Sequence, residues 1–158
     1  MKKISSWGNT SKLLHKVNYL LNKKNSLEIV SSKSKGIVYG MGRSYGDVCL
    51  NHGKAVYKNK YLDRLLSFDD EKGEIECESG VCIKDLQDFL ITKGWMLPVT
   101  PGTEYVSIGG AIANDIHGKN HHKYGTFGNH VKEILLIRSD SEPIICSKEI
   151  NKEIFQAT

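Results

Sequence analysis

The spacing of hydrophobic positions changes in the middle of the chain, from every second residue to the three- and four-residue spacing of a helix. Residues 74–78 alternate between polar and hydrophobic side chains after a polar turn at 69–73, which predicts a strand with one solvated face. A helical face follows, and Gly94 stands where a C-cap glycine is expected. The hydrophobic residues on that face are Ile83, Leu86, Phe89 and Leu90.

Shorter hydrophobic runs predict further strands. The run at 36–39 leads directly into a glycine-rich turn and predicts a short, buried strand. Two runs on either side of the polar residues 139–142 predict a hairpin. The other strands that we expect are 55–57, 65–68, 95–99, 134–137 and 143–146.

Three helices are expected outside the central one. Ser26 is the expected N-cap of a short first helix, and Asn151 that of a last one. Residues 107–113 are small and apolar enough for a tightly packed helix, whereas residues 7–24 mix polar and apolar side chains without a clear period. Short strands and helices that alternate in this way predict an α+β fold rather than a regular doubly wound sheet.

The composition is that of one globular domain, either whole or cut short. The chain has 158 residues, of which 39% are hydrophobic and 25% are charged, as in ordinary water-soluble domains. The net charge is a mild +4, and the basic residues are scattered along the sequence, which argues against nucleic-acid binding. We find neither a secretory signal nor an apolar run long enough to span a membrane.

The cysteines argue against a structural metal site. The four of them, Cys49, Cys77, Cys82 and Cys146, form no C-x-x-C pair, so a zinc knuckle is not expected. Reduced and mostly buried thiols are typical of a cytoplasmic protein.

A glycine-rich turn follows the strand expected at 36–39. Gly40, Gly42 and Gly46 leave backbone N–H groups free to converge on an anion, as in a phosphate cradle. The spacing is one residue too long for the dinucleotide fingerprint of the Rossmann fold, and no Gly-Lys-Ser/Thr follows. Arg43 and Ser44 would add side-chain donors to a pyrophosphate. The alternative is a glycine hairpin without a ligand.

A second glycine-rich stretch lies between Gly102 and Gly125 and also contains histidines and lysines. Repeated glycine lets a ligand lie against the main chain, so we predict that the two stretches form the two walls of one cofactor site. For His121, His122 and His130 we prefer surface or structural hydrogen bonding. The more specific alternative is a histidine-rich metal site. Because no Asp, Glu or Cys stands at a spacing that would complete such a site, we predict no metal.

The motifs of both stretches occur in the same order in one known family. They read G-x-G-R-S-Y-G-D at 40–47, P-G-T at 101–103, G-G-A-I-A at 109–113 and D-I-H-G-K-N-H-H at 115–122. From about residue 7 to its end, the chain resembles the PCMH-type FAD-binding domain of the vanillyl-alcohol oxidase family. Within that family it resembles FAD-linked oxidoreductases similar to decaprenylphosphoryl-β-D-ribose 2′-oxidase.

The resemblance implies a domain of two α/β subdomains that hold extended FAD between them, with a seam near 100–103. It also implies that residues 1–158 are an FAD-binding domain incomplete at its C-terminal end, with the substrate (cap) domain absent. The missing half is then either truncated or a separate subunit.

Site residues follow from the resemblance by position. Tyr45, His117 and Lys119 correspond to residues on the substrate side of the flavin, where His117 would orient a sugar hydroxyl and Lys119 would meet its phosphate. FAD is expected to be non-covalent, because Arg43 stands where some relatives carry the attachment histidine. The implied FAD-binding residues are Gly40, Met41, Gly42, Arg43, Ser44, Tyr45, Gly46, Asp47, Gly102, Ser107, Ile108, Gly109, Gly110, Asn114, Asp115, Ile116 and His117.

The implied activity is oxidation of a sugar hydroxyl by hydride transfer to flavin N5. The implied substrate is a polyprenyl-phosphate pentose, as in cell-wall biosynthesis, or an aldonolactone. The 158 residues alone are expected to be inactive, since later sequence in the family completes the active site. The alternatives are a non-catalytic module that binds a nucleotide or a partner, and one half of a split enzyme.

Overall fold

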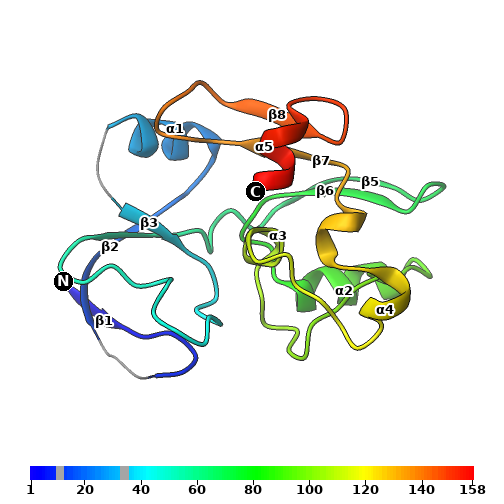
Figure 1. Cartoon of the computed structure of the whole chain (residues 1–158), viewed down its shortest axis with the longest axis horizontal. Helices are drawn as coiled ribbons and strands as arrows, with labels where there is room; N and C mark the ends of the chain where they lie inside the picture. The colour runs from blue at the N-terminus through cyan, green and yellow to red at the C-terminus, as the bar shows by residue number, and fades with distance from the viewer. Residues whose placement is uncertain (10–12, 33–35) are drawn as a thin grey trace.

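The computed structural model describes residues 1–9, 13–32 and 36–158. The part of the chain up to residue 61, here called the N-terminal part, forms a small mixed sheet with one helix beside it (Figure 1). The strand order is β1-β2-β4-β3, with β1 antiparallel to β2 and the other neighbours parallel. The elements are β1 (Lys2–Ile4), β2 (Leu13–Tyr19), α1 (Lys23–Ser31), β3 (Gly36–Tyr39) and β4 (Ala55–Lys58).

The strands predicted at 36–39 and 55–57 are confirmed, but β3 is not a buried strand. Tyr39 is its one buried residue among those described, and Val38 is 57% exposed. The prediction for Ser26 is wrong, because Asn22 is the N-cap of α1 and its side chain accepts the N–H of Asn25. Ser26 is instead buried inside the helix, where its hydroxyl donates to the Asn22 carbonyl at 2.8 Å.

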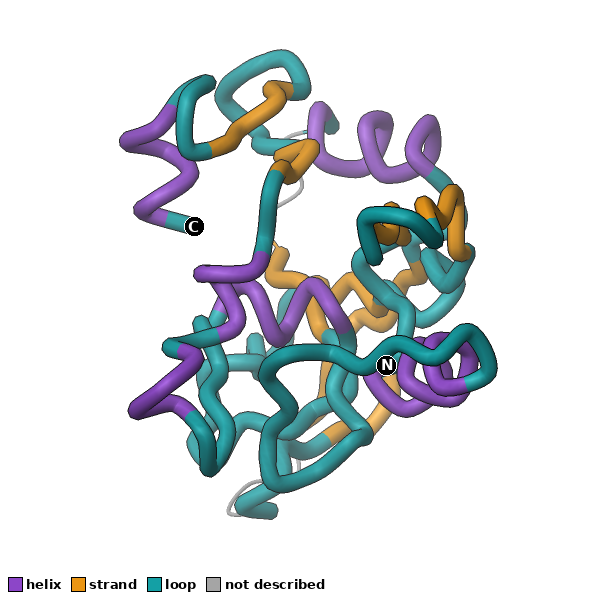
Figure 2. Tube along the Cα trace, turned by 90° about the vertical axis from the view of Figure 1, so that its right-hand side faces the viewer, coloured by secondary structure: helices purple, strands orange, loops and turns teal. Residues whose placement is uncertain are grey.

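Residues 62–158, the C-terminal part, contain two antiparallel hairpins and several short helices. The predicted turn at 69–73 is confirmed between β5 and β6, as is the hairpin around 139–142 between β7 and β8. Figure 2 shows α5 beside that second hairpin at one end of the molecule. The elements are β5 (Leu65–Asp69), β6 (Glu74–Cys77), α2 (Ile83–Ile91), α3 (Ile108–Ala113), α4 (His121–Tyr124), the 3-10 helix η1 (Phe127–His130), β7 (Glu133–Leu136), β8 (Ile144–Ser147) and α5 (Lys152–Ala157).

The main core of the C-terminal part forms where the sequence pattern predicts a helix. Helix α2 buries Ile83, Leu86 and Leu90, and Phe89 packs at the edge of the same cluster. Gly94 has a φ of +79° in the turn that follows the helix, although the C-cap residue is Thr92. The cluster is completed by Val81, Val99, Ile108, Ala111 and Phe127.

The strand predicted at 95–99 is wrong. This segment is irregular, and two of its backbone groups bond to side chains: Leu97 N–H donates to Gln87 Oε1 at 3.3 Å, and the Pro98 carbonyl accepts from Asn120 at 2.9 Å. Pro98 has no N–H for a strand ladder. Val99 is fully buried, and Trp95 and Leu97 pack partly buried against the main core, so alternate residues of the run face the core without a strand partner.

The last predicted helix is confirmed as α5, but Asn151 does not cap it with its side chain. Asn151 adopts a left-handed conformation with φ of 50°, and its amide donates to the Ile145 carbonyl at 2.7 Å. The helix predicted at 107–113 is confirmed as α3. Small sheets and short helices together confirm the α+β class.

Candidate cofactor site

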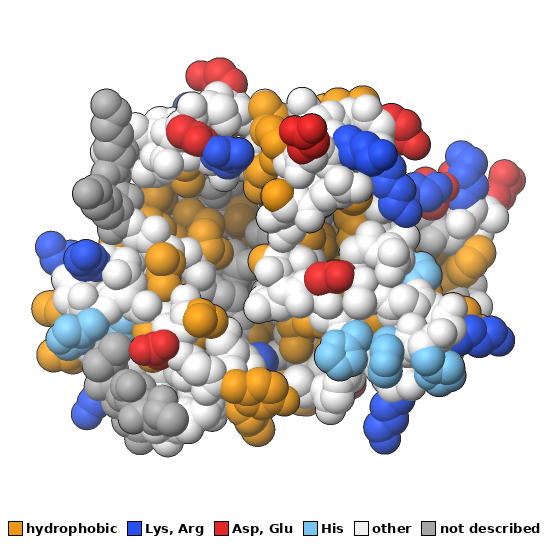
Figure 3. All heavy atoms as spheres, viewed as in Figure 1, with side chains coloured by type: hydrophobic (Ala, Val, Ile, Leu, Met, Phe, Trp, Pro, Cys, Tyr) orange, Lys and Arg blue, Asp and Glu red, His pale blue; other side chains and the backbone are white. Residues whose placement is uncertain are grey.

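The structure brings the two glycine-rich stretches side by side. Where β3 ends, Gly40 lies against the start of α3, and a Cβ at Gly40 would lie 2.5 Å from Ser107 Oγ. Arg43 Nε donates to the Tyr105 carbonyl at 3.1 Å. Figure 3 shows the surface hollowed in this region, between β3 and α3, with hydrophobic side chains in the hollow.

Residues 5–7, near the N-terminus, support the turn at 40–47. Gly42 has φ of +65°, and a Cβ there would lie 2.0 Å from the Tyr39 hydroxyl, so no larger side chain fits. That hydroxyl donates to the Ser5 carbonyl at 2.8 Å. Burial raises the pKa of Tyr39 above its ordinary value, and Cys49 raises it further, so the hydroxyl keeps its proton as a donor. Trp7 N–H donates to the Ser44 carbonyl at 3.1 Å.

The far end of this loop is fixed by a histidine that the sequence analysis did not single out. His15 is fully buried, and its Nε2 accepts the N–H of Asn51 at 2.9 Å. Asn51 in turn donates from its side chain to the Ala55 carbonyl at 3.0 Å. The sequence signal was weak, because His15 interrupts a hydrophobic run in a region without a clear period.

The second wall is packed on a turn that sequence reasoning also missed. Gly109 N–H donates to the Ser79 carbonyl at 2.8 Å, and a Cβ at Gly109 would lie 2.9 Å from Ser79 Cβ. Ser107 Oγ accepts the N–H of Gly110 at 3.3 Å and caps α3. Gly109 therefore serves packing against Ser79, and the Ser-Gly pair at 79–80 after a strand was the available signal.

Both walls carry backbone N–H groups without an acceptor in the described part of the chain. Across the ranges described, the N–H groups of residues 41–47 and 102–104 donate to no other described residue. A phosphate or a flavin oxygen accepts from backbone N–H groups that have no acceptor within the protein. The donor set and the glycine cradle thus fit the pyrophosphate of an extended dinucleotide.

Arg43 is already engaged on the protein side. Its guanidinium carbon lies 5.2 Å from the ring centroid of Trp7 and 5.9 Å from that of Tyr105. Together with the Tyr105 carbonyl contact, these rings hold the side chain between the two stretches.

The stretch that follows α3 uses its side chains to hold itself in shape. Asn114 donates to the Gly110 carbonyl at 2.8 Å, and Asp115, with φ of 38°, accepts the N–H of Gly128 at 2.8 Å. Ile116 packs against the main core. The backbone N–H groups of Asn114 and Asp115 both donate to the Ile112 carbonyl as well, so this stretch bonds mainly to itself.

The three residues expected on the substrate side are exposed. Tyr45 is 84% exposed, and His117 and Lys119 are also exposed. His117 lies with its ring 5.4 Å from that of His121. Between described residues, no hydrogen bond or ion pair joins the side chains of Tyr45, His117 and Lys119, so the structure does not bring them together by direct contact.

His121 and His130 bond to the backbone. A ring nitrogen of His121 lies 3.1 Å from the Gly118 carbonyl, and one of His130 lies 2.8 Å from the Tyr124 carbonyl. Among described residues, no three His, Cys, Asp or Glu side chains are grouped to hold a metal ion. Nor does any helix in the described ranges have the length and apolar character needed to cross a membrane.

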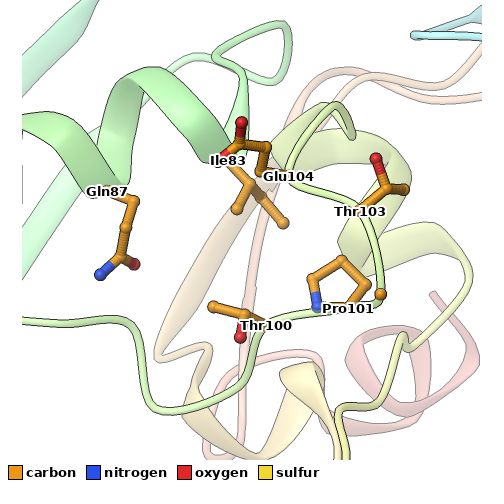
Figure 4. A pocket seen from close by; sticks show the side chains of 7 residues that line it. Ile83, Gln87, Thr100, Pro101, Thr103 and Glu104 are labelled. Carbon is orange, nitrogen blue, oxygen red and sulfur yellow. The ribbon is translucent and has the colours of Figure 1, made fainter.

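Open space surrounds the loop at 100–104. A hollow of about 450 Å³ lies between this loop and α2, and Figure 4 shows Ile83 and Gln87 of α2 facing it. A Cβ at Gly102 would meet nothing within 4 Å, and the same holds for Gly46. Neither glycine is required by internal packing, which leaves room for a ligand at both loops.

Comparisons with known proteins agree with this geometry. A family model described as an FAD binding domain matches residues 27–147. The chain is 36% identical over 149 residues to decaprenylphosphoryl-β-D-ribose oxidase of Mycolicibacterium smegmatis, covering 89% of this chain and 32% of that protein. It is 30% identical over 133 residues to L-gulonolactone oxidase of Scyliorhinus torazame, covering 84% and 30%.

The solved structure of 6-hydroxy-D-nicotine oxidase from Arthrobacter nicotinovorans has the same fold. Its TM-score to this chain is 0.83 at 19% identity, over 97% of this chain and 34% of that one. The chain therefore belongs to the FAD-binding domain family of flavin-dependent oxidoreductases, and its cofactor is FAD. The resemblance predicted from the motifs is confirmed. The chain spans about a third of the length of these curated relatives.

Proposed function

We propose that this chain is the FAD-binding portion of an enzyme that oxidises a hydroxyl of a sugar or a sugar lactone. The observation that carries the proposal is the contact of the turn at 40–47 with residues 105–107, which brings together two stretches whose N–H groups at 41–47 and 102–104 have no acceptor among the described residues. The named substrates of the two curated relatives, a decaprenylphosphoryl ribose and a gulonolactone, support the substrate class.

Each wall would hold a different part of the cofactor. The N–H groups of residues 41–47, with Arg43 and Ser44, would bind the pyrophosphate. Residues 102–110 and the backbone of 114–117 would line the flavin side. Bound flavin would supply the hydride acceptor, N5, for oxidation of the carbon that bears the hydroxyl. We propose non-covalent attachment, because Arg43, and not a histidine, stands in the first loop.

The exposed polar side chains after α3 suit the substrate side. His117 would hold the reacting hydroxyl in place by a hydrogen bond, and Tyr45 would close the same side of the site. The Lys119 ammonium has no acidic partner among described residues, so it remains available for a substrate phosphate.

The remaining parts of the active site belong to sequence that the relatives have and this stretch does not cover. We propose that a substrate domain and the rest of the FAD domain come from continued chain or from a separate subunit. The seam predicted near 100–103 stays a prediction. Cys49, Cys77, Cys82 and Cys146 are free thiols, which suits a reducing compartment such as the cytoplasm.

Flavin titration of purified protein tests the site. Gly46→Trp and Gly102→Trp each attach an indole through a Cβ that meets no other protein atom within 4 Å, so we expect them to fill ligand space without crowding the core. We expect each to weaken FAD affinity at least about ten-fold at unchanged melting temperature, because a steric block removes more than about 1.4 kcal/mol of binding. Gly109 is a poor choice, since its packing against Ser79 would be disturbed with or without ligand.

Ser141→Trp is the matched control, because it adds the same side chain to the exposed turn between β7 and β8. It should bind FAD like the parent protein. Parent-like affinity in both glycine variants would refute the proposed walls. Oxidation of a sugar lactone by the 158-residue chain alone, measured with a dye acceptor, would refute the need for further sequence.

A further inference from the structure

The mild overall charge conceals two oppositely charged parts. Residues 1–61 contain 12 of the 22 Lys and Arg residues and only 2 of the 18 Asp and Glu residues, a net charge of +10. Residues 62–158 contain the remaining 10 basic and 16 acidic residues, a net charge of −6. A division of this size points to a charged partner for one part of the molecule.

The structure keeps the two sets of charges apart. All five ion pairs between described residues join partners that lie between Arg64 and Asp140. No described cation of the N-terminal part takes part in an ion pair with a described acid. Acidic and basic side chains accordingly lie next to one another over the upper right of Figure 3, where the C-terminal part is seen.

Some of these unpaired cations gather around two tyrosine rings, one on β2 and one in the turn after β4. The rings of Tyr19 and Tyr61 lie 5.3 Å apart. Lys60 Nζ lies 4.6 Å from the Tyr61 ring centroid and 5.9 Å from that of Tyr19, and Lys2 Nζ lies 5.8 Å from that of Tyr19. We call these four residues the Lys–Tyr cluster.

A third lysine extends the cluster across the sheet. In the parallel register Lys58 stands opposite both Tyr19 on β2 and Tyr39 on β3, so it lies between them at the C-terminal ends of the strands. Its ammonium lies 5.0 Å from the Tyr39 ring centroid. Three ammonium groups and exposed ring surface, with Tyr61 46% exposed, therefore share one region of the sheet.

We propose that the Lys–Tyr cluster, with Lys58, docks the protein on an anionic lipid surface. Ammonium groups are compact point charges that are drawn to a negatively charged plane, each by about 1 kcal/mol. Tyrosine rings suit the boundary between water and lipid because one end is apolar and the other polar. Arg43 is the one arginine in residues 1–61, so the forked donors that favour nucleic-acid phosphates and bases are nearly lacking. The proposal is independent of the substrate proposed above.

Vesicle sedimentation of the whole 158-residue chain tests the proposal without flavin or substrate. The vesicles contain phosphatidylcholine alone or phosphatidylcholine and phosphatidylglycerol at a ratio of about 7:3. We expect binding to the anionic vesicles only, and release when NaCl is raised from about 50 to 500 mM, because salt screens surface charge. The triple variant Lys2→Gln, Lys58→Gln, Lys60→Gln should bind about 100-fold more weakly, from about 1 kcal/mol for each lysine.

The matched control removes the same charge from the C-terminal part by Lys93→Gln, Lys123→Gln and Lys152→Gln, and should sediment like the parent protein. Lys58 lies partly buried, so Lys2→Gln with Lys60→Gln provides a second variant that leaves it in place, with a loss of about 30-fold.

Equal loss in the control and triple variants would overturn the proposal. So would equal binding to both vesicle types. Tighter binding to a single-stranded oligonucleotide than to anionic vesicles would assign the surface to nucleic acid instead.

Discussion

A single carboxylate ties the start of β5 to the end of β6. Glu78 accepts from Arg64 Nε at 3.1 Å and from the second guanidinium nitrogen at 2.7 Å, and it also accepts the Arg64 N–H at 3.1 Å. The Glu78 side chain is only 11% exposed. These hydrogen bonds to Arg64 hold the pKa of Glu78 below its ordinary value of 4.5, and a two-pronged, charge-assisted contact of this kind stabilises the hairpin.

Replacing Glu78 with Gln tests that contribution. A carboxylate whose pKa is lowered by folding stabilises the fold at neutral pH, and loses that effect as the pH falls below about 4.5 toward the folded value. We expect Glu78→Gln to lower the free energy of unfolding by about 1 kcal/mol at pH 7. The difference from the parent should shrink in urea titrations at progressively lower pH.

Asp69→Asn is the control, because Asp69 pairs with Lys72 in the exposed turn of the same hairpin. Exposed pairs contribute little, so this variant should unfold almost like the parent protein at pH 7. A pH-independent difference between Glu78→Gln and the parent would contradict the role assigned to the carboxylate.

At the scale of elements, α1 depends on a pair of asparagines rather than on the serine that the sequence suggested. Asn22 Oδ1 accepts the N–H of Asn25 at 2.8 Å, and Asn25 Oδ1 accepts the N–H of Leu21 at 3.1 Å. This exchange satisfies two backbone N–H groups at the start of a helix of nine residues, and short helices depend strongly on such caps.

Removing the Asn22 side chain should therefore weaken α1. We expect Asn22→Ala to lower the free energy of unfolding by about 1 kcal/mol, and Asn22→Ser to restore most of the loss because serine also caps. Chemical denaturation followed by circular dichroism measures both. If the alanine variant were as stable as the parent while Ser26→Ala lost the same 1 kcal/mol or so, Ser26 would be the cap after all.

Local pattern predicted the elements that have a regular period or a distinctive turn. Helix α2, the hairpin of β7 and β8, and the strands at 36–39 and 55–57 are in this group. The strand at 95–99 was wrong because burial by distant residues imitates a strand pattern, and β2 was missed because buried His15 interrupts its hydrophobic side. No local pattern reveals which segments, distant in the sequence, will contact each other in the folded chain.

The same limit applies to the candidate site. Glycine spacing indicated the two stretches, and the family motifs indicated FAD. The supports of the stretches, Ser79 under Gly109 and His15 under Asn51, join residues about 30 positions or more apart, so only the folded chain shows them. Neither residue type is unusual for its position in the sequence.

At the scale of the whole molecule, the N-terminal and C-terminal parts meet at a close backbone crossing. Asn59, buried at the end of β4, donates from its side chain to the Ser79 carbonyl at 3.1 Å. Next to it, Gly80 N–H donates at 2.7 Å to the carbonyl of Leu62, the first residue of the C-terminal part. Since Ser79 also accepts from Gly109, the crossing supports the second wall of the cofactor site directly.

Gly80 cannot be replaced by a residue with a side chain without disturbing this crossing. A Cβ at Gly80 would lie 2.0 Å from the Asn59 carbonyl oxygen and 2.7 Å from that of Leu62, and backbone atoms cannot turn aside as side chains do. We expect Gly80→Ala to lower the free energy of unfolding by about 3 kcal/mol, a fall in melting temperature of about 10 °C. FAD affinity should fall with it, because the displaced crossing moves Ser79 away from Gly109.

Gly46→Ala, where the added Cβ meets open space, should leave the melting temperature within about 2 °C. Thermal unfolding with and without FAD measures both effects, and a Gly80→Ala protein that melts like its parent but binds FAD more weakly would show that the crossing shapes the cofactor site without holding the two parts together.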